Sequence, residues 1–261
     1  MNVQHQSFKN LAWLFISMLT LPFLLACSTE SIDGIETEDV AFYGGIYTDN
    51  TETVQAIASL SDVDDSSVDY ELPSGDTFVA CVDSVCKEMR DSDVGFLFPG
   101  GPIYSATLPF LTDKEYTLSL SRKSNSDAPD SKVILPDDFQ ILQPIADSEF
   151  YDGEFIPVSW SPSGAEFLVI VATKLDCLLA DGTRENYFGD VGFIRDGADY
   201  YESSIKDNLR STNGSEDSDV QSCIIDIEVS HERYGKADST YARGSISAEI
   251  IRKIQVKYRG P

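Results

Sequence analysis

Few side chains in this sequence could build a catalytic centre. Beyond the first 26 residues the only histidine is His231, so a histidine-based zinc site or catalytic triad would have to form around it. His231 follows an alternating apolar segment and precedes Glu232 and Arg233, and we expect it to be exposed. The sequence contains no GxSxG, HExxH, P-loop or Rossmann glycine pattern. We therefore predict no catalytic residues, no cofactor and no enzymatic activity.

Carboxylates are abundant, but they form no recognisable site. A glycosidase needs two of them flanking one bond, and no pair stands out, because most of the acids lie in expected turns, where Asp binds neighbouring backbone N–H groups. Two acidic runs are candidates for calcium: Asp62, Asp64 and Asp65, then Glu216, Asp217 and Asp219. Neither run matches an EF-hand loop, and solvated turns are the alternative. We predict no metal site, with the first run as the best calcium candidate.

Aromatic side chains could supply a binding surface, since exposed rings can stack on the faces of sugars. Three groups lie near expected strand ends: Phe42-Tyr43 with Tyr47, Tyr187-Phe188, and Tyr200-Tyr201. In the alternative interpretation, one ring of each adjacent pair points into a core and the other is half covered.

The N-terminal segment predicts export. Residues 1–10 are polar with one cation, Lys9, and residues 11–26 are almost wholly apolar, which is short for a membrane-spanning helix and typical of a signal peptide. Leu24-Leu25-Ala26-Cys27 resembles the lipobox of bacterial lipoproteins. The resemblance implies cleavage before Cys27 and its acylation with two or three chains, enough for stable anchoring in a lipid bilayer. It also implies, from Ser28 in place of Asp, the outer membrane of the cell envelope.

Four further cysteines, Cys81, Cys86, Cys177 and Cys223, predict two disulfides in an exported chain. If Asp83-Ser84 is a two-residue turn, Cys81 and Cys86 form the non-hydrogen-bonded pair of a hairpin, with Cα atoms about 4.5 Å apart and within bonding range. Cys177 and Cys223 are left for each other. Zinc is the weaker interpretation, since CxxxxC without a nearby histidine is a poor signature.

Charge restricts the partners. The 44 Asp and Glu residues outnumber the 19 Lys and Arg, giving a formal net charge of −25. A surface this acidic is repelled by nucleic-acid phosphates and by anionic lipid headgroups. We predict no nucleic-acid partner.

Short apolar runs separated by Gly, Pro, Asp and Ser predict an all-β fold. Val54, Ala56, Ala58 and Leu60 alternate with polar residues, as do Tyr116, Leu118 and Leu120, and Cys223 to Val229. Gly44-Gly45 is a predicted turn. In the last strand Arg252 interrupts an apolar face, which predicts a bulge or a split strand, and a buried Arg252 would need a carboxylate partner.

The organisation we predict is two β-sandwich domains in tandem. The polar, acidic residues that follow Cys27 indicate a tether of at most about 40 Å. A Pro- and Asp-rich stretch within residues 122–138 marks the junction. The predicted segments are a signal peptide at 1–26, the lipidated cysteine and tether at 27–39, and β-sandwich domains at 40–136 and 137–261.

Several short motifs resemble a loose group of uncharacterised exported bacterial proteins with two immunoglobulin-like modules. They are Arg122 with 126–131, 135–136 with 139–141, 158–162 (Val-Ser-Trp-Ser-Pro), 189–192 and 244–246. The resemblance implies immunoglobulin-like folds and no assigned activity.

These observations together predict a non-enzymatic, membrane-anchored envelope lipoprotein that acts as a binding, spacer or assembly module. Its predicted partners are the bilayer, through acylated Cys27, and an envelope protein or a glycan. The alternative is a glycan-binding or calcium-dependent adhesion module at the cell surface.

Overall fold

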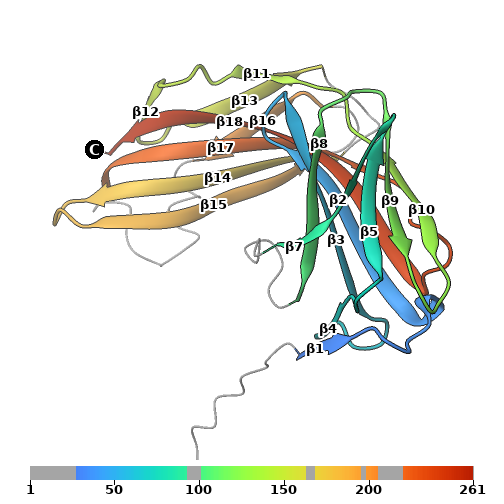
Figure 1. Cartoon of the computed structure of the whole chain (residues 1–261). Coiled ribbons are helices and arrows are strands. Elements are labelled where there is room, and N and C mark those ends of the chain that lie inside the picture. Colours follow the sequence, from blue (N-terminus) through green and yellow to red (C-terminus); the bar gives the residue numbers. More distant parts are fainter. Residues whose placement is uncertain (1–27, 93–100, 163–167, 195–197, 205–219, 261) are drawn as a thin grey trace, which may run out of the picture.

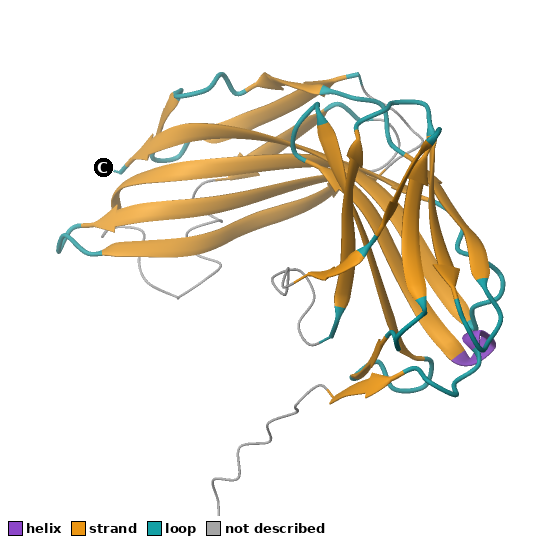
Figure 2. Cartoon of the chain, viewed as in Figure 1, coloured by secondary structure: helices purple, strands orange, loops and turns teal. Residues whose placement is uncertain are grey.

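The computed structural model describes residues 28–92, 101–162, 168–194, 198–204 and 220–260. Within these ranges the chain is all-β, as predicted, and its one helical element is the 3-10 turn η1, Thr37–Asp39 (Figure 2). The described part of the chain holds no helix long and apolar enough to cross a membrane. The predicted signal peptide and Cys27 lie outside it.

Eighteen strands follow one another along the described chain. The first ten are β1 Ser28–Ser31, β2 Val40–Thr48, β3 Thr53–Asp62, β4 Val68–Glu71, β5 Thr77–Val82, β6 Val85–Glu88, β7 Arg90–Ser92, β8 Ile103–Pro109, β9 Glu115–Ser121 and β10 Ala128–Ile134. The others are β11 Gln140–Gln143, β12 Glu149–Tyr151, β13 Phe155–Ser161, β14 Leu168–Leu179, β15 Arg184–Ile194, β16 Tyr200–Ser204, β17 Val220–Tyr234 and β18 Arg243–Arg259.

The first lobe, built from β1–β10, contains two packed sheets. Strands β2, β3 and β8 belong to the large sheet, and a smaller sheet in the order β10-β9-β5-β6 covers one of its faces. Phe42 of β2 and Phe78 of β5 meet in this core, with ring centroids 6.2 Å apart. The alternation predicted for β3 and β9 is confirmed, because one face of each strand is buried: Val54, Ala56, Ala58 and Leu60, and Tyr116, Leu118 and Leu120.

The second lobe, built from β11–β17, repeats this layering. Strands β17, β14 and β15 continue the large sheet, and a smaller sheet in the order β11-β13-β16 accompanies them. Trp160 on β13 is 1 % exposed, so it faces a core as predicted. Cys223, Ile225, Ile227 and Val229 form the buried face of β17, which confirms the predicted strand.

Strand β18 joins the two lobes. Residues 243–250 pair in parallel with β2, and residues 247–259 pair antiparallel with β17. One sheet therefore runs through both lobes and bends between them (Figure 1). The boundary expected at residues 136 and 137 does not separate two sheets, and the division into independent tandem domains stays a prediction.

Arg252 does not disturb β18. Its pairing with β17 is continuous from Ser247 to Arg259, so the predicted bulge or split is wrong. Arg252 instead occupies the apolar face, where its guanidinium lies over the Phe139 ring at 5.9 Å and donates to Asp138. The carboxylate partner expected for this arginine is thus Asp138, and it makes an arginine tolerable on a largely buried face.

Gly44 and Gly45 lie within β2, so the turn predicted there is wrong. A Cβ on Gly44 would lie 2.6 Å from the Phe42 ring and 2.9 Å from a Leu118 methyl. Strand interiors tolerate glycine where neighbours approach closely, and here the space is filled by side chains of the first core.

The tether predicted for residues 28–39 is wrong in the described residues. Ser28–Ser31 forms β1, which pairs in parallel with β4, and the Ile32 amide donates to the Glu71 carbonyl at 3.1 Å. Ile32 and Thr37 are fully buried. A polar, acidic composition indicated a solvated chain, but two buried side chains and pairing to a distant strand hold this segment on the first lobe.

Both predicted cysteine pairs are bonded in the structure. Cys81 and Cys86 face each other across the β5–β6 hairpin with Cα atoms 4.1 Å apart, and Asp83 in its turn has φ 53°. Cys177 and Cys223 face each other across β14 and β17 with Cα atoms 4.0 Å apart. Each disulfide therefore links directly opposed residues of neighbouring strands.

Candidate functional site

A groove of about 710 Å³ lies on the face of the large sheet opposite the first lobe's core. Figure 1 shows the small sheets of both lobes on the outer side of the bend, so the groove faces the inner side. Its lining comes mostly from β2, β3, β18 and β17 and from the β2–β3 turn, with Ile103 at the start of β8. The chief residues are Tyr43, Tyr47, Gln55, Ile57, Glu249 and Ile251.

Strand register arranges the groove side chains in rows. Glu232, Glu249, Tyr47, Gln55 and Thr107 face one another in turn across β17, β18, β2, β3 and β8. The Gln55 amide nitrogen lies 2.9 Å from the Thr107 hydroxyl. Because opposed residues of neighbouring strands have side chains on the same face, this row presents carboxylate, phenol and amide groups side by side.

The apolar part of the groove lies beside that row. Tyr43 is 38 % exposed and stands opposite Ser59, while Gly45 stands opposite Ile57. Because Gly45 has no side chain, the Ile57 side chain packs close to the β2 backbone, where a Cβ would lie 3.1 Å from it, and only 8 % of Ile57 stays exposed. A ring, an aliphatic floor and adjacent polar groups are the typical composition of a ligand-binding cleft.

The carboxylates of the groove influence one another. Burial raises the pKa of Glu249, the Ser230 hydroxyl lowers it, and the neighbouring Glu232 and Glu228 raise it. Glu228 is neutralised in part by Lys253, whose ammonium lies 3.0 Å away. Burial, and then Asp49, raises the pKa of the Tyr47 phenol, which stays a hydrogen-bond donor at neutral pH. The groove thus offers several hydrogen-bond acceptors, two phenol rings that can donate, and one cation, Lys253.

The acidic run at Asp62, Asp64 and Asp65 forms a turn at the end of β3. Asp62 accepts from the amides of Asp64 and Asp65, both at 2.8 Å, and from the Tyr70 hydroxyl at 2.7 Å. The Tyr70 hydrogen bond is the largest cause that lowers the pKa of Asp62, followed by the two amides. No group of three or more His, Cys, Asp or Glu side chains converges on a metal position within the described ranges. The second run, Glu216, Asp217 and Asp219, lies outside them.

His231 is fully buried, so the prediction that it is exposed is wrong. Strand β17 continues to Tyr234, and the period of two places His231 on the same face as Val229 and Ile227. Its ring stacks on Phe139 with centroids 3.7 Å apart, and Trp160 meets it edge-on at 6.5 Å. Burial, and then the Arg252 charge, lowers the pKa of His231 to about 4. This histidine belongs to the core of the second lobe.

The adjacent aromatic pairs follow the inward–outward alternative. Phe42 and Tyr187 are buried, whereas Tyr43 and Phe188 are 38 % and 73 % exposed. Tyr200 is 47 % exposed, and Tyr201 is half-buried. Of all these rings, only Tyr43 and Tyr47 line the groove, so the structure brings two rings of the first group to one site, leaves Phe42 in the core, and leaves the other two groups apart from it.

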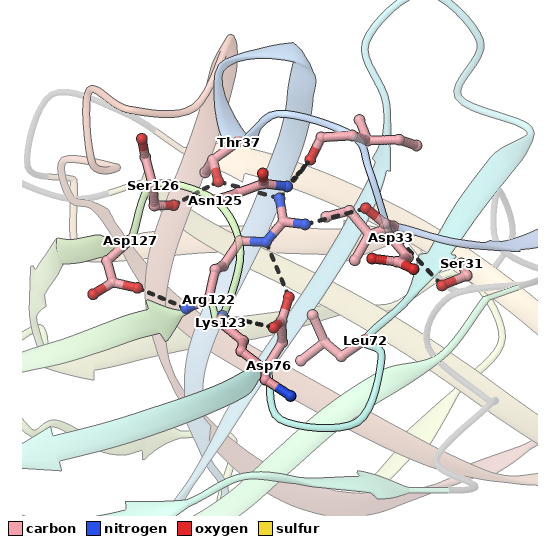
Figure 3. Close-up of polar contacts among 12 residues, drawn as sticks. Ser31, Asp33, Thr37, Leu72, Asp76, Arg122, Lys123, Asn125, Ser126 and Asp127 are labelled. Carbon is pink, nitrogen blue, oxygen red and sulfur yellow. Dashed lines mark hydrogen bonds and ion pairs between the residues drawn. The ribbon is translucent and has the colours of Figure 1, made fainter.

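A buried polar cluster around Arg122 was not anticipated from the sequence (Figure 3). The Arg122 Nε lies 3.0 Å from an Asp76 carboxylate oxygen, with side chains that are 2 % and 4 % exposed. Asp76 also accepts from the Lys123 amide at 2.9 Å, and Asp127 accepts from the Arg122 amide at 2.6 Å. The side-chain partners of Arg122 lie 46 to 90 positions away in the chain, too distant to form a local sequence pattern.

Comparisons with known proteins add little to this picture. No protein-family model and no curated protein matches the chain. Among solved structures, the fibronectin(III)-like modules of Clostridium thermocellum CbhA align over 84 % of this chain and 93 % of theirs, at 12 % identity and a TM-score of 0.25. The likeness is between β-rich proteins, and at this score it carries no argument about the site. The fold rests instead on the strand order and core given above.

Proposed function

We propose that this protein is a non-enzymatic lipoprotein of the cell envelope, anchored through acylated Cys27 to the outer membrane, that binds a partner in the groove on its large sheet. The anchor is supported by the apolar segment and lipobox that precede Ser28. The binding role is supported by one observation, the groove of about 710 Å³ lined by Tyr43, Tyr47 and Glu249.

Affinity capture from lightly crosslinked native cells tests this proposal. The acylated protein is expected to recover one stoichiometric envelope component, which is lost with Cys27→Ser because the protein no longer reaches the membrane. Tyr47→Ala should lose the component while keeping the anchor. Tyr200→Ala, which removes an exposed ring from outside the groove, is the matched control and should retain it. Equal recovery of the component by the wild type and by the Cys27→Ser, Tyr47→Ala and Tyr200→Ala variants would contradict a partner that binds in the groove.

A glycan is the second candidate for the ligand. Tyr43 and Tyr47 lie in the groove beside Gln55 and Glu249, and rings next to amide and carboxylate groups suit the apolar faces and hydroxyls of a sugar chain. A glycan array probed with the wild-type protein and with Tyr47→Ala tests it. Binding that disappears in the variant would support a glycan ligand. Calorimetry with calcium, repeated with Asp62→Asn, tests the calcium-dependent version, and no heat in either titration would dismiss it.

A further inference from the structure

Beyond the β1–β4 pairing, Arg122 binds the segment that follows Cys27 to the first lobe at three points. The Arg122 guanidinium donates to the Ile35 carbonyl at 2.8 Å, the Ile32 carbonyl at 3.1 Å and the Thr37 hydroxyl at 3.2 Å. Figure 3 shows these contacts converging on the guanidinium from the N-terminal segment, with Asp76 on the other side. One planar guanidinium thus binds three residues of the segment 32–37 at once.

Neighbouring groups reinforce the attachment. The Asn125 amide nitrogen donates to the same Ile35 carbonyl at 2.7 Å, and the Thr37 hydroxyl donates to the Ser126 carbonyl at 2.6 Å. Within the described ranges, Asp76 is the carboxylate that the guanidinium binds. A buried arginine without its carboxylate is strongly unfavourable, so the pair and the segment it binds are expected to stay together.

From this arrangement we propose that Arg122 and Asp76 form a latch that removes the free tether between Cys27 and the body. Acyl chains on Cys27 would then hold the β1–β4 end of the first lobe directly against the bilayer, in one orientation. Without the latch, residues 28–39 could extend about 40 Å and let the body tumble. The inference rests on the proposed acylation of Cys27 for its membrane part, but not for the latch itself.

The negative charge of the β1–β4 end of the first lobe restricts which lipid headgroups this end can approach. The segment carries Glu30, Asp33, Glu36, Glu38 and Asp39 and no basic residue, and the acidic turn at 62–65 follows the β3 end of the same sheet. Anionic headgroups repel such a surface, whereas zwitterionic headgroups do not. We therefore assign this end to a zwitterionic bilayer surface, such as phosphatidylcholine or phosphatidylethanolamine.

Hydrogen exchange on the mature chain carrying Cys27→Ser tests the latch without lipid. The hydrogen-bonded amides within residues 30–40, those of Ile32, Ile35 and Asp39 among them, should exchange at least about 100-fold more slowly than in an unstructured peptide, because they open only when the segment detaches. Arg122→Met should remove most of this protection. Asn125→Ala deletes a single neutral donor to the Ile35 carbonyl and should remove part of the protection. This second variant keeps the latch testable if Arg122→Met folds poorly. Arg184→Met, at an exposed ion pair with Asp176, should change nothing. Rapid exchange of residues 30–40 in the wild type would overturn the latch.

Hydrogen exchange of the acylated protein on phosphatidylcholine vesicles tests the orientation. Residues of β1, β4 and η1 should gain protection on the vesicles, while the β14–β15 turn at 179–184 should not. Asn125→Ala should weaken this footprint with acylation intact, and vesicles of phosphatidylglycerol should also weaken it. A vesicle footprint equal on both lobes would overturn the fixed orientation. An intact mass without acyl chains would overturn the anchorage and the orientation, and the lipid-free measurement would still decide the latch.

Discussion

At the scale of single residues, the buried ion pair between Arg122 and Asp76 is the most consequential contact in the described chain. The guanidinium of Arg122 binds Asp76, Ile35 and Ile32, which are 46, 87 and 90 positions away from it in the sequence. In the sequence, Asp76 is one of 44 acidic residues and has no neighbour that distinguishes it. Long-range pairing of this kind is decided by the fold, so no local pattern could have revealed it.

Removing Asp76 should destabilise the protein more than removing a typical carboxylate. Asp76→Ala leaves a buried guanidinium without its counter-charge, and we expect a loss of about 3 to 5 kcal/mol in the free energy of unfolding. Urea denaturation measures it. Asp176→Ala removes the partner of the exposed Arg184 and should cost less than about 1 kcal/mol. Similar losses in the two variants would contradict the burial of the Arg122 pair.

His231 should make the stability depend on pH. Its pKa falls from 6.5 to about 4 on folding, so the unfolded state binds the extra proton at intermediate pH. The stability that neutral, buried His231 contributes is fully present above pH 6.5, the pKa of the unfolded state, and is lost as the pH falls from 6.5 towards 4. Between about pH 7.5 and about pH 5, we expect a loss of about 2 kcal/mol.

The His231→Phe variant isolates that contribution, because a ring of similar size can keep the stack on Phe139 while it does not titrate. Thermal or urea unfolding at the two pH values should show a smaller loss for the variant than for the wild type. If both proteins lost the same free energy, the pH dependence would belong to other groups and His231 would not be buried in its neutral form.

At the scale of elements, local alternation predicted the strands well. β3, β9 and β17 each follow a period of two in which apolar residues face a core, and this pattern is readable without any partner strand. The same rule extended by one step would have placed His231 on the buried face of β17. The predictions of a turn at Gly44-Gly45 and of a tether at 28–39 were wrong for another reason. Both rested on local composition, whereas contacts with residues distant in the chain determine the conformation of these segments.

The two disulfides should differ in what they contribute, since they close loops of different length. Cys177 and Cys223 are 46 positions apart, and Cys81 and Cys86 are 5 apart. Replacing both cysteines by alanine should cost about 4 kcal/mol for the long loop and about 2 kcal/mol for the short one. Denaturant unfolding of the two double variants measures the difference. A larger loss for the hairpin pair would contradict the loop-length account.

At the scale of the whole molecule, the continuous sheet is the feature that the sequence did not reveal. The apolar face of β18 was recognisable, but its parallel pairing with β2 near the other end of the chain was not. That pairing joins the lobes and builds the groove, because it places the β17–β18 hairpin beside the distant β2–β3 hairpin. Tyr43 and Tyr47 were identifiable as candidate binding residues; their meeting with Gln55, Glu249 and Ile251 depends on the fold.

The measurement that tests the account most directly is site-specific photocrosslinking in native cells, with a photoreactive phenylalanine analogue at position 47 and, separately, at position 200. A binding groove predicts one discrete crosslinked envelope component from position 47 and none from position 200, although the side chains at both positions reach the surface. Crosslinks of equal strength from the two positions, or none from position 47, would contradict the assignment of the groove as the binding site.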